Sequence, residues 1–150
     1  MLDDEDAIQF SEQAKRAKLR QVIAGTDQAY GLAKKHGVRL AWGTDTLFDG
    51  GLAARQGAQL AKMTRWFTPA EVLKMATSDN AALCAMSGQR DPYPGRLGVV
   101  EEGALADLLL VDGNPLEDLQ LLAHPDRTLL VIMKNGTIYK QLTSELRRAR

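Results

Sequence analysis

One short apolar segment constrains this fold more than any other feature of the sequence. Residues Val38 to Trp42 follow Gly37 and lead directly into Gly43. A helix, a tight glycine turn and a strand in this order are typical of a parallel α/β sheet. The first 90 residues contain no second segment of this kind, and one parallel strand cannot form a sheet. We therefore expect this strand to need partners from outside these residues.

Two helices are predicted on either side of this segment. The apolar residues of the first recur at helical spacing and are Leu19, Val22, Ile23, Tyr30 and Ala33. Gly37 supplies the C-terminal cap of this helix. The second helix is marked by Leu52, Leu60, Met63 and Phe67. Both are predicted to be amphipathic, the second less clearly than the first.

The sequence TPAE predicts the start of a third helix. Thr68 can cap this helix and Glu71 can reach back to the Thr68 amide, which completes a capping box. A fourth helix is expected from a cap at Ser78 or Asp79 to its end at Gly88.

The character of the chain changes at RDPYPG, residues 90–95, where two prolines and a glycine exclude regular structure. We place a domain boundary there. Beyond it, RLGVV at 96–100 is predicted as a strand, and ADLLLVDGNP as a strand buried on both faces. In TLLVIMKNGTIYKQL, the pair Asn135-Gly136 tolerates the positive φ angles of a type I′ turn and predicts a hairpin.

Composition limits the classes of partner. Hydrophobic residues make up 45% of the 150 residues and charged residues 25%, proportions typical of a globular domain. The 19 Lys and Arg balance the 19 Asp and Glu, so no net field attracts nucleic acid or an anionic membrane. No apolar run approaches 18 residues. The runs DDED at 3–6 and RRAR at 147–150 are interpreted as solvated termini. We expect neither a nucleic-acid nor a membrane partner.

The single cysteine, Cys84, excludes an internal disulfide framework. It lies among apolar helix residues, so we interpret it as a small buried hydrophobe rather than a nucleophile. Localisation stays open, with a lean towards the reducing cytoplasm.

Asp45 is the candidate functional residue because it lies where the apolar strand gives way to a loop ending in Gly50-Gly51. A divalent metal lowers the pKa of its bound water to about 7, and a neighbouring carboxylate can then deprotonate that water. The alternative is structural, because aspartates that cap a helix or close a turn are far commoner. The residues alone leave both readings open.

Four segments together resemble one protein family. In chain order they are GVRLAWGTD, TPAEVLKMATSDNAA, GRLGVVEEGALADLLLVDGNPLEDL and VIMKNGTIYK. From about residue 15 to 142 the chain is similar to the C-terminal part of metal-dependent amidohydrolases. It is most similar to the branch that holds imidazolonepropionase-like enzymes and dipeptidases cleaving Xaa-Pro or Xaa-Arg dipeptides.

This resemblance implies an α/β fold in which residues 1–90 form the C-terminal segment of a (β/α)₈ barrel. The segment 38–42 would be the eighth strand of that barrel. Residues 91–142 would supply the C-terminal strands of a small β-sandwich, and residues 143–150 would form a tail.

The resemblance also implies roles for residues of the loop. Active sites of such barrels lie at the C-terminal ends of the strands. Asp45 corresponds to an aspartate that serves similar enzymes as a metal ligand and as the catalytic base. Thr46, Leu47 and Phe48, which follow Asp45, are expected to contact the substrate.

The implied function is metal-dependent hydrolysis of amide or peptide-type C–N bonds in a small-molecule or dipeptide substrate, with zinc as the expected metal of the complete enzyme. The family's other ligands are a His-x-His pair, a Lys or Glu, and further histidines. They have no counterpart here, because the only histidines are His36 and His124 and neither lies in such a motif. We expect this chain alone to be inactive and to hold no metal tightly.

A non-catalytic function is the alternative. The chain could be a remnant or interaction module whose unpaired strand edges self-associate or bind a missing N-terminal partner. Under either reading we expect a homo-oligomer or a partner polypeptide.

Overall fold

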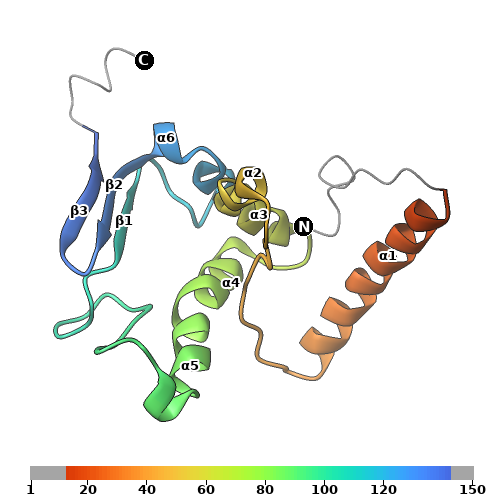
Figure 1. Cartoon of the computed structure of the whole chain (residues 1–150), viewed down its shortest axis with the longest axis horizontal. Helices are drawn as coiled ribbons and strands as arrows, with labels where there is room; N and C mark the ends of the chain where they lie inside the picture. The colour runs from red at the N-terminus through yellow and green to blue at the C-terminus, as the bar shows by residue number, and fades with distance from the viewer. Residues whose placement is uncertain (1–12, 143–150) are drawn as a thin grey trace.

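The computed structural model describes residues 13–142. The runs at 3–6 and 147–150 and the predicted tail at 143–150 lie outside these residues. The helices are α1 (Gln13–Lys35), α2 (Gly50–Ala53), α3 (Gln56–Ala61), α4 (Pro69–Lys74), α5 (Asn80–Ala85) and α6 (Pro125–Thr128). The strands are β1 (Leu108–Val111), β2 (Leu129–Lys134) and β3 (Thr137–Gln141). Figure 1 shows α1 at one end of the molecule, the sheet at the other, and α2 to α5 between them.

Helix α1 ends as the sequence predicts. Gly37 adopts a φ of 62°, which costs glycine little. The Val38 N–H donates to the Ala33 carbonyl at 2.9 Å, and the Gly37 N–H donates to the Lys34 carbonyl at 3.2 Å. These two bonds form a Schellman motif, so the predicted cap is confirmed.

The inner side of α1 differs from the prediction at one position. Its buried and partly buried residues are Leu19, Ile23, Thr26, Tyr30 and Ala33. Val22 was expected on this side but is 42% exposed. The residues that face the protein recur at intervals of three and four, and Val22 lies about 100° from Ile23 around the helix. Thr26 therefore occupies the place expected for a further apolar residue.

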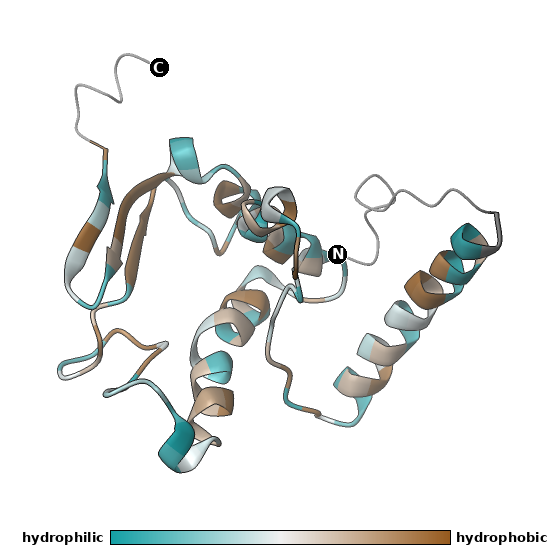
Figure 2. Ribbon diagram, in the orientation of Figure 1, coloured by the Kyte–Doolittle hydropathy of each residue, from teal (hydrophilic) through white to brown (hydrophobic). Residues whose placement is uncertain are grey.

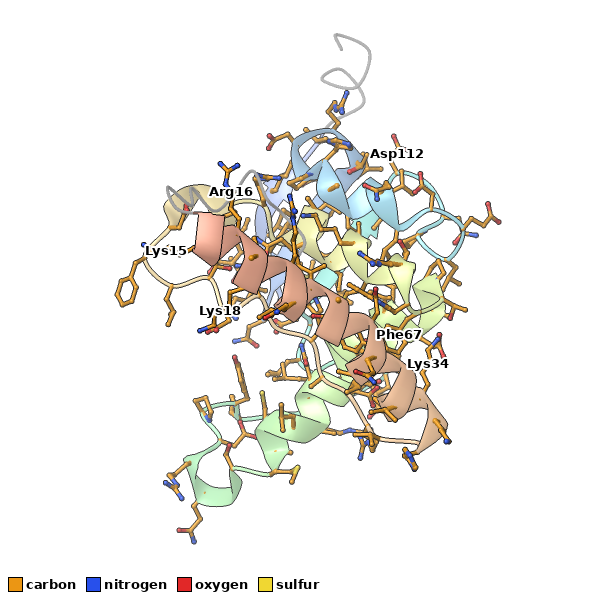
Figure 3. The ribbon with its side chains drawn as sticks, turned by 90° about the vertical axis from the view of Figure 1, so that its right-hand side faces the viewer. Lys15, Arg16, Lys18, Lys34, Phe67 and Asp112 are labelled. Atoms are coloured by element: carbon orange, nitrogen blue, oxygen red, sulfur yellow. The ribbon has the colours of Figure 1, made fainter. Side chains whose placement is uncertain are left out.

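An aromatic cluster docks α1 on the rest of the chain. The Tyr30 ring centroid lies 4.8 Å from that of Trp66 and 5.3 Å from that of Phe67. The Lys34 ammonium lies 4.6 Å from the Phe67 ring centroid, a cation–π contact, and it also donates to the Trp66 carbonyl (Figure 3). Trp66 Nε1 donates to the Asp27 carboxylate at 2.6 Å.

No helix of residues 13–142 is both long enough and apolar enough to cross a membrane.

The segment Val38 to Trp42 is extended but has no strand partner within residues 13–142. The prediction of a sheet strand is therefore wrong for this part of the chain. This segment forms no sheet because residues 13–142 contain no neighbouring parallel strand with which it could pair.

The second predicted helix is broken into α2, α3 and a 3-10 turn, Lys62–Arg65. The four apolar residues that marked it, Leu52, Leu60, Met63 and Phe67, are all buried, as predicted. Asp49 begins α2 as its N-cap, because its carboxylate accepts the Leu52 N–H at 2.9 Å.

The third helix begins with the predicted capping box at Thr68 and Glu71. The Glu71 carboxylate accepts the Thr68 N–H at 2.7 Å, and the Thr68 hydroxyl accepts the Glu71 N–H at 3.3 Å. The backbone and hydroxyl hydrogen bonds from Thr68 lower the pKa of Glu71 below its usual value.

The predicted break between the third and fourth helices is wrong. Instead of a cap at Ser78 or Asp79, a π turn, Met75–Asp79, joins α4 to α5 without interruption. Asp79 makes no capping hydrogen bond, because its carboxylate pairs with Lys74 and Arg39. The helix leads into Gly88, which has a φ of 57°, close to its predicted end.

The three strands form one antiparallel sheet in the order β1-β2-β3. Asn135 and Gly136 have φ angles of 47° and 78°, which confirms the predicted hairpin turn. RLGVV at 96–100 is irregular rather than a strand. β1 was expected to be buried on both faces, yet Leu109 is 54% and Leu110 55% exposed. The described residues therefore do not pack closely enough against β1 to bury these two side chains.

One apolar core joins the helices to the β region. The buried residues of this cluster are Leu60, Met63, Phe67, Val72, Met75, Leu119, Leu122 and Leu129. Strands β1 and β2 are predominantly apolar (Figure 2). Val111 and Ile132 of these strands pack against the cluster. The core thus draws on both sides of residues 90–95, and the domain boundary proposed there stays a prediction.

A close backbone approach at Gly57 provides a test of this packing. A Cβ at Gly57 would lie 1.8 Å from the Leu122 carbonyl oxygen, so α3 and the turn Leu119–Ala123 would have to separate. We expect Gly57→Ala to cost about 1–3 kcal/mol, measured as a fall in Tm. Gly25→Ala is the control, since no heavy atom lies within 4 Å of its Cβ and alanine should stabilise α1. Equal effects of both changes on Tm would contradict the close approach.

Candidate functional site

The loop that follows Val38 to Trp42 places Asp45 between α1 and α2. Thr44 and Thr46 are partly buried, whereas Asp45 is exposed. Exposure therefore alternates along residues 44–46. Asp45 does not stand at the tip of a paired strand, because the segment before it has no strand partner among residues 13–142.

The backbone of this loop is unusual at two residues. Asp45 has a φ of 50° and Phe48 a φ of 65°. The Asp45 carbonyl accepts the Leu47 N–H at 3.1 Å, which closes a tight turn between them. Aspartate tolerates the left-handed region better than most residues, whereas a bulky aromatic residue is strained there. Such backbone strain is concentrated at functional sites in proteins, so this loop is a candidate site.

The Asp45 carboxylate makes no hydrogen bond or ion pair with the described residues. The capping role that was its structural alternative belongs to Asp49, four residues later. The reading of Asp45 as the cap of the helix after Gly51 is therefore wrong. Its side chain is available to interact with another molecule.

Asp45 lines a cavity of about 380 Å³. The walls come from α1, from residues 40–45, and from the stretch between Gln59 and Met75. The aromatic side chains of the wall are Tyr30, Trp42 and Trp66. This volume and this mainly apolar lining are typical of sites for small molecules.

Two buried polar oxygens lie in this region without a hydrogen-bond partner among the described residues. They are Thr46 Oγ1, next to Asp45, and Gln59 Oε1. Gln59 lines the cavity and is only 6% exposed, and its Nε2 donates to the Leu52 carbonyl at 3.1 Å. Sequence reasoning did not identify Gln59, because a glutamine on a short amphipathic helix carries no motif.

The segment before Asp45 is held by the helix beyond the cavity. The Trp42 N–H donates to Asn80 Oδ1, and Asn80 Nδ2 donates to the Trp42 carbonyl, both at 2.9 Å. Arg39 lies 3.3 Å from the Asp79 carboxylate, which Lys74 also approaches at 2.5 Å. Asn80 thus binds the backbone of this segment at Trp42, and Asp79 binds the side chain of Arg39 in the same segment.

The charge of Asp79 is stabilised in this arrangement. Its side chain is 12% exposed. The hydrogen bond from Lys74 lowers the pKa of Asp79 most, and the hydrogen bond from Arg39 lowers it further, against the opposite effect of burial.

The loop residues proposed as substrate contacts lie beside Asp45. Leu47 is 68% exposed and Phe48 is fully exposed, whereas Thr46 is partly buried. The two histidines are exposed and in other parts of the chain. Cys84 is only half-buried, so its expected burial is partial.

The described residues do not fit a metal site by themselves. Within residues 13–142, no three His, Cys, Asp or Glu side chains lie close enough together to hold a metal ion. A zinc site takes three or four protein ligands, and Asp45 supplies one.

Comparison with known proteins identifies relatives of this chain. The family model described as the amidohydrolase family matches residues 1–139. An ochratoxinase from Aspergillus niger is 36% identical over 124 residues, which are 83% of this chain and 24% of that protein. The chain therefore spans about a quarter of the length of this curated relative.

Two solved structures of hydrolases are also similar to this chain. The crystal structure of A. niger ochratoxinase matches with a TM-score of 0.72 and 27% identity, over 93% of this chain and 30% of that one. A prolidase crystallised with N-methylphosphonate-L-proline matches with a TM-score of 0.69 and 29% identity, over 84% of this chain and 29% of that one.

The ionic contacts of Asp79 predict a pH-dependent contribution to stability. The pKa of Asp79 is lowered in the folded chain, so its contribution is complete above the ordinary value of 3.8 and is lost as pH falls through the lowered folded value. Asp79→Asn should lower Tm by about 2–4 °C at pH 7, and the difference should shrink below about pH 4. Thermal melts of both chains from pH 7 to pH 3 measure it.

Asp45→Asn is the control for this series, because Asp45 makes no ion pair with the described residues. Its Tm should stay close to that of the wild type throughout. A difference for Asp79→Asn that is constant with pH would contradict the ionic explanation.

Proposed function

This chain belongs to the amidohydrolase family, and on that premise we propose that it contributes Asp45 to an enzyme hydrolysing amide or peptide-type C–N bonds. The observation that carries the proposal is the Asp45 carboxylate itself. It lines a cavity of small-molecule size and has no partner among residues 13–142. The helix cap that would explain it structurally is made by Asp49.

Asp45 is proposed as the proton acceptor of the reaction. A water molecule attacks the amide carbon while its proton passes to the carboxylate, and the C–N bond breaks when the nitrogen receives a proton. Members of the family generally depend on a metal. Because the described residues do not fit such a site alone, Asp45 would be a metal ligand, with zinc the proposed metal, only where other polypeptide supplies further ligands.

The proposed substrate is a small amide or dipeptide with an apolar part. Leu47 and Phe48 present apolar side chains to solvent directly after Asp45, and with Thr46 they are proposed to contact the substrate. The mainly apolar walls of the cavity support this class of substrate. Support also comes from the related prolidase, which was crystallised with a proline derivative.

The rest of the active site is proposed to come from further strands beside residues 38–42. This would make residues 1–90 the C-terminal segment of a (β/α)₈ barrel and residues 91–142 part of a β-sandwich. The lack of a strand partner along 38–42 and the exposed edge of β1 support the proposal, because backbone without a strand partner can accept a strand from a partner or a further segment. At Trp42 the side-chain amide of Asn80 already occupies one side of the segment.

The catalytic proposal predicts the effect of Asp45→Asn. The chain should be co-expressed with a polypeptide that supplies the remaining barrel strands, and turnover of an amide substrate measured. Asparagine has the same shape and tolerates the φ of 50° at this position, so Tm should hardly change. Turnover should fall about 10²-fold or more through loss of the base.

Asp49→Asn is the matched control, since asparagine caps a helix as well as aspartate does. It should preserve both Tm and turnover. Unchanged turnover in Asp45→Asn would end the assignment of Asp45 as the base.

A second function is favoured by the exposed edge strand. Leu109 and Leu110 of β1 are more than half exposed, and one edge of β1 has no strand partner among the described residues. Unpaired apolar edges promote association. The chain could therefore act as a non-catalytic module that self-associates through this strand.

The association proposal predicts an oligomer in solution. Light scattering of the purified chain should give a mass above 16.4 kDa that falls towards the monomer in Leu109→Lys. Leu47→Lys is the control, because it places the same charge at an exposed leucine away from the sheet. A monomeric wild type at high concentration would contradict the proposal.

A further inference from the structure

We propose that Asn80 is a positioning residue for Asp45, and that the π turn Met75–Asp79 is the part of the fold that presents it. The inference rests on the proposed role of Asp45. Asn80 does not line the cavity beside Asp45. It acts through the backbone of Trp42, which lies three residues before Asp45.

The two hydrogen bonds between Asn80 and Trp42 imitate a neighbouring strand. In an extended backbone, the N–H and C=O of one residue point to the same side, where a second strand would pair with both. The side-chain amide of Asn80 offers one acceptor and two donors, so it satisfies both groups of Trp42, each at 2.9 Å. The Asn80 side chain therefore makes the two backbone hydrogen bonds that Trp42 would otherwise make with a neighbouring strand.

Trp42 is the last fixed point of the backbone before the Asp45 turn. Within residues 39–44, its N–H and C=O are the backbone groups that are hydrogen-bonded to other described residues. Its side chain packs against the core cluster and lines the cavity. Loss of the Asn80 bonds would leave the backbone from Arg39 to Thr44 without an anchor of its own.

The π turn determines where the Asn80 side chain lies. The Asn80 N–H donates to the Met75 carbonyl, five residues back, instead of the Ala76 carbonyl that an α-helix would use. Asn80 Nδ2 lies 3.5 Å from the Ala76 oxygen while it also donates to Trp42. The π turn thus leaves the Ala76 carbonyl free of the Asn80 N–H, and the Asn80 side-chain amide contacts this carbonyl while it binds Trp42.

The backbone of the π turn is in close contact with Gly98. Gly98 has a φ of 72°, and a Cβ there would lie 2.5 Å from the Thr77 carbonyl oxygen. Asp79, the last residue of the turn, binds Arg39 of the extended segment. The turn therefore makes a close backbone contact with Gly98 and an ion pair with the segment that carries Asp45.

The test compares loop order with global stability in the chain as it stands. Asn80→Leu removes both hydrogen bonds at similar size, and Asn80→Asp keeps an acceptor for the Trp42 N–H but loses the donor. In Asn80→Leu, ¹⁵N order parameters of Gly43 to Asp45 should fall from about 0.85 to below about 0.6. Hydrogen exchange of the Trp42 amide should accelerate about tenfold or more, with a smaller change in Asn80→Asp.

Asn114→Leu is the matched control. Asn114 also makes two side-chain hydrogen bonds, to the Leu116 N–H and the Glu117 carboxylate, but it touches no residue of the loop. It should alter Tm without changing the order parameters at Asp45. A fall in Tm for Asn80→Leu with unchanged order parameters and exchange would reduce Asn80 to a structural role and overturn the proposal.

Two further outcomes are separable. If Asn80→Leu does not fold, Asn80→Asp decides, since equal loop order in that variant and the wild type would overturn the proposal. In the co-expressed assembly, Asn80→Asp should lower kcat with little change in KM. If the loop loosens in Asn80→Leu but Asp45→Asn keeps full turnover, positioning stands and the catalytic role of Asp45 fails.

Discussion

The segment of residues 38–44 has no neighbouring strand among the described residues, and the surrounding structure compensates for this. A backbone N–H or C=O group removed from water needs a hydrogen-bond partner. Here the partner for Trp42 is a side-chain amide from a helix, and Arg39 is held by the carboxylate beside it. Both contacts come from the end of the π turn Met75–Asp79 and the residue after it, where α4 continues into α5.

The apolar core acts together with that anchor. Leu119 and Leu122, far along the chain, pack on α3, where Gly57 allows the two backbones to approach closely. Trp42 packs against the same cluster and lines the cavity. The cavity beside Asp45 is therefore bounded by residues whose positions depend on the core, as a binding site requires.

The features that could be predicted from the sequence are those decided within a few residues. The Gly37 cap, the capping box at Thr68 and the turn at Asn135-Gly136 each depend on contacts inside one turn. The expected cap at Asp79 failed because its carboxylate pairs with Lys74 and with Arg39, and the contact with distant Arg39 could not be anticipated from local sequence. The burial of β1 failed because it depends on what covers the strand, and periodicity does not report that.

The candidate site was predictable only in part. The position of Asp45 after an apolar segment followed from the sequence. Only the structure shows that Asp45 lies in a tight turn and that Asp49, not Asp45, caps the next helix. Asn80 was missed, although asparagine is a poor helix former and its place inside a helical pattern called for a reason. Gln59 gave no comparable signal.

The positive φ of Asp45 has a consequence for the history of such a chain. Glycine and asparagine adopt this backbone conformation with least strain, so they are the residues that drift could place here without disturbing the fold. Neither can accept a proton at neutral pH. A lineage could thus lose the proposed base in one substitution while every helix and strand persisted, and its shape would continue to resemble that of an enzyme.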